Sequence, residues 1–312
     1  MPEHRIILDC DPGQDDAVAI LLALGSPEEI EVVAITTVAG NVPLALTALN
    51  ARKVTALAGR PEIPVHAGCA RPILRPLETA EYVHGETGLN GAELPEPAAP
   101  LAPGHAVDVI VEELMRRPPG TVTLCPIGPL TNVALAMVKE PAIIPRIRQI
   151  VLMGGAIELG NVTAAAEFNI YVDPHAAKVV FESGAPIVML GLDVTHKALV
   201  TDGRLARIAA IGTPVARACA GLLDFYNRYD KDRYHIPGAP LHDPCVIAWL
   251  LRPELFEGRL RRVDIETEGV HSVGRTVVDW WQRSALPANA LVVNHLDAEG
   301  FFALLCERLA RL

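Results

Sequence analysis

The chain has 312 residues, of which 50% are hydrophobic, and a formal net charge of −10 at pH 7. This acidic balance argues against nucleic acid as a partner, because phosphate binding needs clustered Lys and Arg side chains. No apolar stretch is long enough to cross a bilayer, and a strand pattern starts too near the first residue for a secretory signal. Six scattered cysteines fit a reducing compartment, so we expect a cytoplasmic protein without membrane partners.

Short apolar segments alternate with helical patterns through the first part of the chain. The apolar segments lack polar alternation, which is typical of strands buried on both faces. We predict strands over residues 5–9, 31–36, 121–125, 149–153 and 186–190, and helices over residues 15–24, 43–58, 105–116, 130–139 and 174–183. This alternation predicts a mostly parallel, Rossmann-like doubly wound α/β sheet.

The pattern changes after about residue 195. We predict helices over residues 213–230 and 244–251, shorter strands over 262–267, 275–278 and 290–293, and a final helix over 298–312. No low-complexity linker or internal repeat divides the chain. We therefore expect one domain, residues 1–312, whose C-terminal helices and short strands cap the functional site.

The acidic turn after the first predicted strand, Asp9-Cys10-Asp11-Pro12-Gly13-Gln14-Asp15-Asp16, is the most informative segment. Helix capping explains one or two of its aspartates, because an Asp near a helix N-terminus stabilises the helix by roughly 0.5–2 kcal/mol. The remaining carboxylates repel one another unless a cation lies between them, and clustered oxygen ligands select a hard cation such as Ca²⁺ or Mg²⁺. Since open α/β sheets bind ligands at the carboxyl ends of their strands, we predict a metal site at this turn.

Two further motifs have more than one interpretation. In Ala166-Glu167-Phe168-Asn169, a carboxylate and an amide on an extended segment would point to the same face and could bind sugar hydroxyls, but the pattern alone favours a solvated loop. His242-Asp243-Pro244 has the pattern of a helix start. A His beside a metal site is also suited to donating a proton to a leaving group.

A loop histidine and a tyrosine-rich stretch are further candidates. His84 lies in a glycine-containing loop of the kind that closes over substrates, although an exposed loop histidine is an equally good interpretation. Tyr229 and Tyr234 belong to an aromatic, charged stretch at a predicted helix end. They could stack on a base or pack in the core.

Five motifs, in order along nearly the whole chain, resemble those of the inosine–uridine preferring nucleoside hydrolase family. They are Asp9-Cys10-Asp11-Pro12-Gly13-Gln14-Asp15-Asp16-Ala17, Ala34-Ile35-Thr36-Thr37-Val38-Ala39-Gly40-Asn41, Val151-Leu152-Met153-Gly154-Gly155, Ala166-Glu167-Phe168-Asn169 and Leu241-His242-Asp243-Pro244. The resemblance implies a Rossmann-like fold, hydrolysis of the N-glycosidic bond of ribonucleosides with a bound Ca²⁺, and a role in nucleoside salvage or catabolism. It also implies a homodimer or homotetramer.

The resemblance also implies a role for each matching residue. The side chains of Asp11, Asp16 and Asp243 and the main-chain carbonyl of Ile127 would hold Ca²⁺, whose bound water would be the nucleophile, with Asp11 as the general base. His242 would protonate the leaving base, with His84 or Tyr229 as alternative helpers. The nucleoside would be bound by Asp15, Asn41, His84, Met153, Asn161, Glu167, Phe168, Asn169, Tyr229 and Tyr234.

Two other hypotheses stay open. A calcium-dependent ribose-binding protein without catalysis would keep the metal site, but the presence of both Asp11 and His242 favours activity. An aspartate-nucleophile phosphatase also ends a strand in Asp-x-Asp and would depend on Asp9, but it expects Thr or Val where this chain has Pro12. The preferred base is not readable from the sequence, which fits pyrimidine, inosine or mixed specificity.

Overall fold

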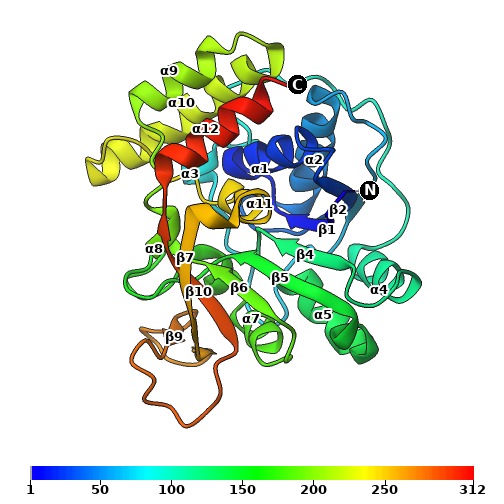
Figure 1. Cartoon of the computed structure of the whole chain (residues 1–312), viewed down its shortest axis with the longest axis vertical. Coiled ribbons are helices and arrows are strands. Elements are labelled where there is room, and N and C mark those ends of the chain that lie inside the picture. Colours follow the sequence, from blue (N-terminus) through cyan, green and yellow to red (C-terminus); the bar gives the residue numbers. More distant parts are fainter. Residues whose placement is uncertain (1) are drawn as a thin grey trace.

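The structure, a computed structural model, describes residues 2–312 apart from the side chains of Asp230 and Tyr234. Its centre is an eight-stranded sheet in the order β3-β2-β1-β4-β5-β6-β10-β7, and a two-stranded sheet joins β8 and β9 (Figure 1). The strands are β1 His4–Cys10, β2 Ile30–Thr37, β3 Val65–Ala67, β4 Val122–Pro126, β5 Ile147–Met153, β6 Ile187–Leu190, β7 Phe256–Arg261, β8 Val263–Ile265, β9 Thr276–Val278 and β10 Ala290–Leu296. Only β7 pairs antiparallel in the large sheet.

Helices cover both faces of the large sheet (Figure 1). The helices are α1 Gln14–Leu24, α2 Leu44–Leu57, α3 Glu81–His84, α4 Ala106–Arg116, α5 Thr131–Lys139, α6 Phe168–Val172, α7 Pro174–Phe181, α8 Leu192–Thr195, α9 Asp202–Ala210, α10 Pro214–Tyr234, α11 Pro244–Leu251 and α12 Ala298–Leu309, with 3₁₀ turns η1 Pro141–Arg146 and η2 Pro253–Leu255. One core packs α1, α2, α11 and α12 against the sheet, and a second core packs α4, α5 and α7 against its other face. No helix among the described residues has both the length and the apolar composition to span a membrane.

The strand order explains where a ligand can bind. From β1 the chain builds outward through β2 to β3, then returns to the other side of β1 and builds outward again through β4, β5 and β6. The order therefore reverses between β1 and β4, and the crevice outside the carboxyl ends of strands at such a reversal is where open α/β sheets bind ligands. The acidic turn follows β1 at this point, and Ile127 directly follows β4.

The expected α/β fold with a mostly parallel doubly wound sheet is confirmed, and its five predicted N-terminal strands are present within one or two residues. The structure differs from the C-terminal prediction at two strands. The predicted short strand at 290–293 is present as β10, which extends to Leu296 and joins the large sheet, and β7, which was not predicted, pairs with it as an edge strand. β7 was missed because half of the residues in its sequence, FEGRLR, are charged, as an edge strand exposed to water allows.

The prediction also missed β3 and α9, together with the short helices α3, α6 and α8 and the two 3₁₀ turns. β3 contains three residues, too few for a periodic pattern, and is held by its pairing with β2. α9, with the sequence DGRLARIAA, has a single buried residue, Ile208, so its apolar stripe is too narrow to stand out.

Candidate active site

A cavity of about 1130 Å³ opens at the carboxyl ends of the strands. Its lining includes most of the residues that the sequence singled out: Asp15, Asn41, His84, Ile127, Met153, Asn161, Glu167, Phe168, Asn169, Tyr229, His242 and Asp243. Asp11 and Asp16 are fully buried beside this lining. The predicted base contact by Tyr234 falls outside the described side chains. Chain segments more than two hundred residues apart in sequence therefore meet at one cavity.

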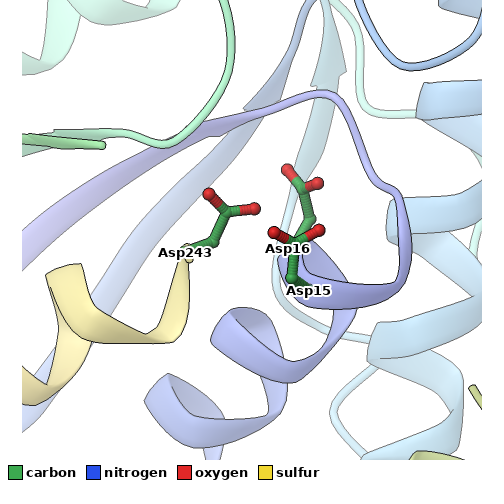
Figure 2. Close-up of side chains that lie close together, drawn as sticks. All are labelled: Asp15, Asp16 and Asp243. Carbon is green, nitrogen blue, oxygen red and sulfur yellow. The ribbon is translucent and has the colours of Figure 1, made fainter. Parts of the chain in front are cut away.

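Three aspartates converge at the floor of this cavity. Asp15 and Asp16 come from the first turn of α1 and Asp243 from the start of α11, and Figure 2 shows the Asp243 carboxylate turned toward the other two. One carboxylate oxygen from each lies within 4.8 Å of the others. Asp243 is the N-cap residue of α11, yet its side chain makes no capping hydrogen bond, so capping does not explain its position. The cluster is suited to holding a metal ion.

Asp11 extends the acidic cluster beneath the cavity. Its Oδ2 accepts a hydrogen bond of 2.7 Å from the Asn41 main-chain N–H, whereas its buried Oδ1 has no hydrogen-bond partner among the described residues. A Cβ at Gly128 would lie 2.3 Å from Oδ1, and one at Gly40 would lie 2.0 Å from Oδ2. Two glycines thus leave the space that the carboxylate occupies, and one of its oxygens keeps an unused lone pair.

Asp16 is the aspartate that does cap a helix. Its Oδ2 accepts from the Gly13 main-chain N–H at 3.0 Å and from the Asn41 amide at 3.1 Å, and its Oδ1 accepts from the Asp11 main-chain N–H at 3.1 Å. These donors fold the turn back on itself and fix the Asp16 carboxylate. The capping interpretation therefore accounts for Asp16 and leaves Asp11, Asp15 and Asp243 to another cause.

Burial raises the free energy of the ionised carboxylates of the cluster when no cation lies beside them. Burial raises the pKa of Asp15 to about 8 and that of Asp16 to about 6. The pKa values of Asp11 and Asp243 are raised well above their ordinary range, first by burial and then by the neighbouring carboxylates Asp16 and Asp15, respectively. A divalent cation would offset both causes, which fits the donor set of acidic oxygens.

Glu167 and Asn169 also line the cavity. The sequence predicted an extended segment here, but the structure has the start of a helix. Glu167 is the N-cap of α6, and its carboxylate accepts hydrogen bonds from the main-chain N–H groups of Asn169 and Ile170. It also accepts from the Gly155 N–H at 2.8 Å, while burial raises its pKa to about 7. A capping residue was not expected here because the helix has only five residues.

Asn169 joins this wall to the end of β4. Its Nδ2 donates to the main-chain carbonyl of Ile127 at 2.9 Å and to that of Met153 at 3.2 Å. Asn161, in turn, accepts from the Phe168 main-chain N–H through its amide oxygen at 3.0 Å. These amides are fixed in place and leave further donor and acceptor positions for a polar ligand.

His242 and His84 reach the cavity from different elements. His242 Nδ1 lies 2.7 Å from the Thr195 hydroxyl, and burial, together with His196 and His84, lowers the pKa of His242 well below its ordinary value. Burial likewise lowers the pKa of His84 to about 3, so His84 is not an exposed loop residue. Both rings are therefore neutral at pH 7.

Tyr229 packs against Tyr82 with ring centroids 5.6 Å apart.

Sequence reasoning missed two polar partners of these histidines. Thr195, at the end of α8, holds the His242 ring, and Gln14, within the acidic turn, contacts His84. Thr195 carried a weak signal, because the polar residues Asp193, Thr195 and His196 follow directly after a predicted buried strand. Gln14 carried none, since its partner is distant in sequence.

Comparison with known proteins gives a consistent result. The sequence pattern of the family described as inosine-uridine preferring nucleoside hydrolase matches residues 6–303. The chain is 50% identical over 306 residues, 98% of each chain, to the pyrimidine-specific ribonucleoside hydrolase RihA of Photobacterium profundum. It is 51% identical over 309 residues, 99% of each chain, to an uncharacterized protein of Schizosaccharomyces pombe. A solved purine-preferring ribonucleoside hydrolase from Gardnerella vaginalis superposes with a TM-score of 0.91 at 34% identity, covering 98% of each chain.

Proposed function

This chain belongs to the inosine-uridine preferring nucleoside hydrolase family and is a ribonucleoside hydrolase, and we propose that it acts on pyrimidine ribonucleosides. The observation that carries the proposed chemistry is the acidic cluster of Asp11, Asp15, Asp16 and Asp243 at the floor of a cavity. Breaking an N-glycosidic bond places positive charge on the ribose ring, and fixed carboxylates stabilise such charge best where water is excluded.

The proposed base preference rests on the relatives. RihA, named as pyrimidine-specific, is 50% identical to this chain, whereas the solved hydrolase named as purine-preferring is 34% identical. The cavity volume of about 1130 Å³ does not discriminate between the bases, because it exceeds what either kind of nucleoside fills.

We propose Ca²⁺ as the metal ion, held by Asp11, Asp16, Asp243 and the main-chain carbonyl of Ile127. The unpartnered Oδ1 of Asp11 and the convergence of the Asp16 and Asp243 carboxylates support this ligand set, whereas the third carboxylate that converges with those two is that of Asp15. The Ile127 carbonyl accepts one hydrogen bond from Asn169 and keeps a second lone pair. When bound, Ca²⁺ would supply Lewis-acid chemistry that orients sugar hydroxyls and lowers the pKa of a water molecule.

The side chains that line the cavity are proposed to bind the ribose. Asp15 holds the 2′-hydroxyl, Asn169 the 3′-hydroxyl and Glu167 the 5′-hydroxyl, with Asn41 and Asn161 assisting. Met153 and Phe168 pack on the sugar. The fixed positions of the amides and carboxylates and the family resemblance support these roles.

Asp11 and His242 are proposed to move the two protons of the reaction. Asp11 accepts a proton from the attacking water at Oδ1, the oxygen without a hydrogen-bond partner among the described residues. Water forms the new bond to C1′ as the bond to the base nitrogen breaks. His242, after it has taken a proton from solvent, donates its Nε2–H to the departing base and returns to the neutral ring, while the Thr195 hydroxyl oxygen accepts from Nδ1–H. A general acid of this kind contributes about 10²–10⁴-fold in rate.

The alternative hypotheses have less support. A phosphatase would need Asp9 as nucleophile, but this buried carboxylate accepts hydrogen bonds from Thr36 and Asn132 and does not line the cavity. A binding protein without catalysis would have no use for a base and an acid on the two sides of the sugar. A cytoplasmic role in nucleoside salvage or catabolism, one domain spanning residues 1–312, and assembly into a homodimer or homotetramer stay predictions.

The base preference is tested by measuring kcat/KM for uridine, cytidine, inosine and adenosine. We expect uridine and cytidine to exceed both purine nucleosides by about 10-fold or more, the scale on which pocket contacts discriminate between substrates. Faster hydrolysis of inosine or adenosine would contradict the pyrimidine preference. Release of ribose from none of the four would contradict the proposed substrates altogether.

A further inference from the structure

The side chain of Gln14, the first residue of α1, holds His84 at two points. Its Nε2 donates to the main-chain carbonyl of His84 at 2.9 Å and to that of Asn90 at 3.1 Å. Its Oε1 lies 2.7 Å from Nδ1 of the same His84 ring. Both Gln14 and His84 are buried. One amide therefore fixes the backbone and the ring of a residue seventy positions away in the chain.

The chemistry of these contacts determines where the His84 proton lies. Only the NH₂ group of Gln14 can donate to two carbonyl oxygens, so the other end of the amide, facing His84, is the oxygen. An amide oxygen only accepts, and Nδ1 must therefore carry a hydrogen and donate it. Since a neutral imidazole has one ring hydrogen, Nε2 of His84 is left with a lone pair.

The position of the His84 ring leaves the Nε2 lone pair available to a ligand in the cavity. The ring lines the cavity and stacks on Tyr226 at a centroid distance of 5.6 Å and an interplanar angle of 24°. Within the part of the chain that the structure describes, no group hydrogen-bonds to Nε2. The ring is thus held by Nδ1 on one edge and by Tyr226 on one face, and its Nε2 edge remains for a ligand.

We propose that Gln14 is a positioning residue that fixes His84 as the Nδ1–H tautomer, so that Nε2 accepts a hydrogen bond from the bound nucleoside. In this tautomer His84 has no proton to give at Nε2. It therefore binds a donor group of the substrate and does not serve as a helper acid, and protonation of the leaving base falls to His242. This inference rests on the proposed function, because it takes the cavity as the nucleoside site.

The tautomer of His84 can be determined by NMR without measuring hydrolysis. In two-bond ¹H–¹⁵N spectra of Ca²⁺-supplemented protein labelled with ¹⁵N-histidine, the His84 signals are assigned from their loss in His84→Ala. We expect a protonated Nδ1 and an unprotonated Nε2. A hydrogen on Nε2 of the wild-type protein would overturn the proposal. Because no substrate is needed, this reading stands even if uridine is not hydrolysed.

Two variants of Gln14 separate its acceptor from its donors. Gln14→Met removes both, and the Nδ1–H signal pattern is expected to be lost. Gln14→Glu keeps an oxygen for Nδ1–H and loses only the donors to the two carbonyls, so the Nδ1–H pattern is expected to persist. If the Gln14→Met protein does not fold, the Gln14→Glu spectrum still decides, because loss of the pattern there would refute control by the Gln14 oxygen.

Kinetics then test whether Gln14 acts through His84. We expect Gln14→Met to lower kcat/KM for uridine by about 10-fold or more, as for an unsatisfied buried hydrogen-bonding group. Combined with His84→Ala, it should lower kcat/KM no further than His84→Ala alone. Asn50→Ala is the matched control, since the Asn50 amide ties the same loop through the Thr87 carbonyl without touching the ring. The fold-losses in kcat/KM caused by Asn50→Ala and His84→Ala should multiply in the double variant. If the fold-losses caused by Gln14→Met and His84→Ala also multiply, the proposal is overturned.

Discussion

Replacing Asp11 by Asn is expected to lower kcat for uridine by about 10²–10⁴-fold, the contribution of a general base. The substitution keeps an oxygen that can accept from the Asn41 N–H and replaces the unpartnered Oδ1 by an amide nitrogen, which cannot take a proton from water. It also removes one of several buried like charges, so we expect the folded state to persist. Ribose release at saturating uridine and the thermal unfolding midpoint, Tm, measure the two effects.

Asp9→Asn is the matched control for this experiment. Asp9 lies on β1, two residues before Asp11, is equally buried, and accepts from Thr36 and Asn132 through Oδ1, which an Asn side chain can also do. We expect it to retain kcat within about 10-fold, below the effect of removing a general base. A loss confined to Asp9→Asn would instead support the phosphatase hypothesis, and equal activity of Asp11→Asn and wild type would rule out Asp11 as the base.

Ca²⁺ added to chelator-treated protein is expected to raise Tm by roughly 4 °C or more. At a Ca²⁺ concentration one hundred times Kd, binding to the folded state contributes about 2.7 kcal/mol, and each kcal/mol raises Tm by about 1.5 °C in a chain of this length. Thermal unfolding with chelator and with excess Ca²⁺ measures the shift. Identical Tm values in the two conditions would contradict a tightly bound Ca²⁺.

The shift in Tm is also expected to grow between pH 6 and pH 8. Burial raises the pKa of Asp15 to about 8 and that of Asp16 to about 6, above the values that these carboxyls have in the unfolded chain. A carboxyl with a raised pKa contributes stability below its unfolded pKa and loses it as the pH rises through its folded pKa. The metal-free protein should therefore lose stability as the pH rises, whereas Ca²⁺ favours the ionised carboxylates.

Asp243→Asn provides the control for the Tm measurements. The Asp243 side chain makes no capping hydrogen bond, so its replacement by an isosteric amide leaves the start of α11 intact. We expect this variant to fold and to show a smaller Ca²⁺-dependent shift. A shift as large as that of the wild-type protein would place the ion away from the cluster in Figure 2.

The site was more predictable than the periphery of the fold, for physical reasons. Like charges in Asp9–Asp16 signal a binding site without reference to the rest of the chain, because their repulsion needs compensation wherever they lie. The alternation of apolar and helical segments likewise predicts the sheet, because the positions of the apolar residues depend on which faces of the strands and helices are buried. The edge strand β7 has solvent-exposed positions and charged residues at half of its positions, so its sequence lacks the apolar pattern of a buried strand.

Long-range polar partners were the part of the site that could not be predicted. Thr195 meets His242 and Gln14 meets His84 only after the chain has folded, and neither pair has a characteristic spacing. The conformation of Glu167 was mispredicted for a related reason: α6 is one short turn, whose start is fixed by tertiary contacts to Gly155. Local patterns locate charged groups, whereas the partners that orient them depend on topology.

The account is tested most directly by following ribose release from uridine while Ca²⁺ is titrated into chelator-treated protein. It predicts no release above background before the addition, and release that rises with Ca²⁺ to a plateau, with one uracil formed for each ribose. Undiminished release in the presence of chelator would contradict the proposed metal site. No release at any Ca²⁺ concentration, in protein whose Tm shows that it binds the ion, would contradict the proposed hydrolysis of uridine.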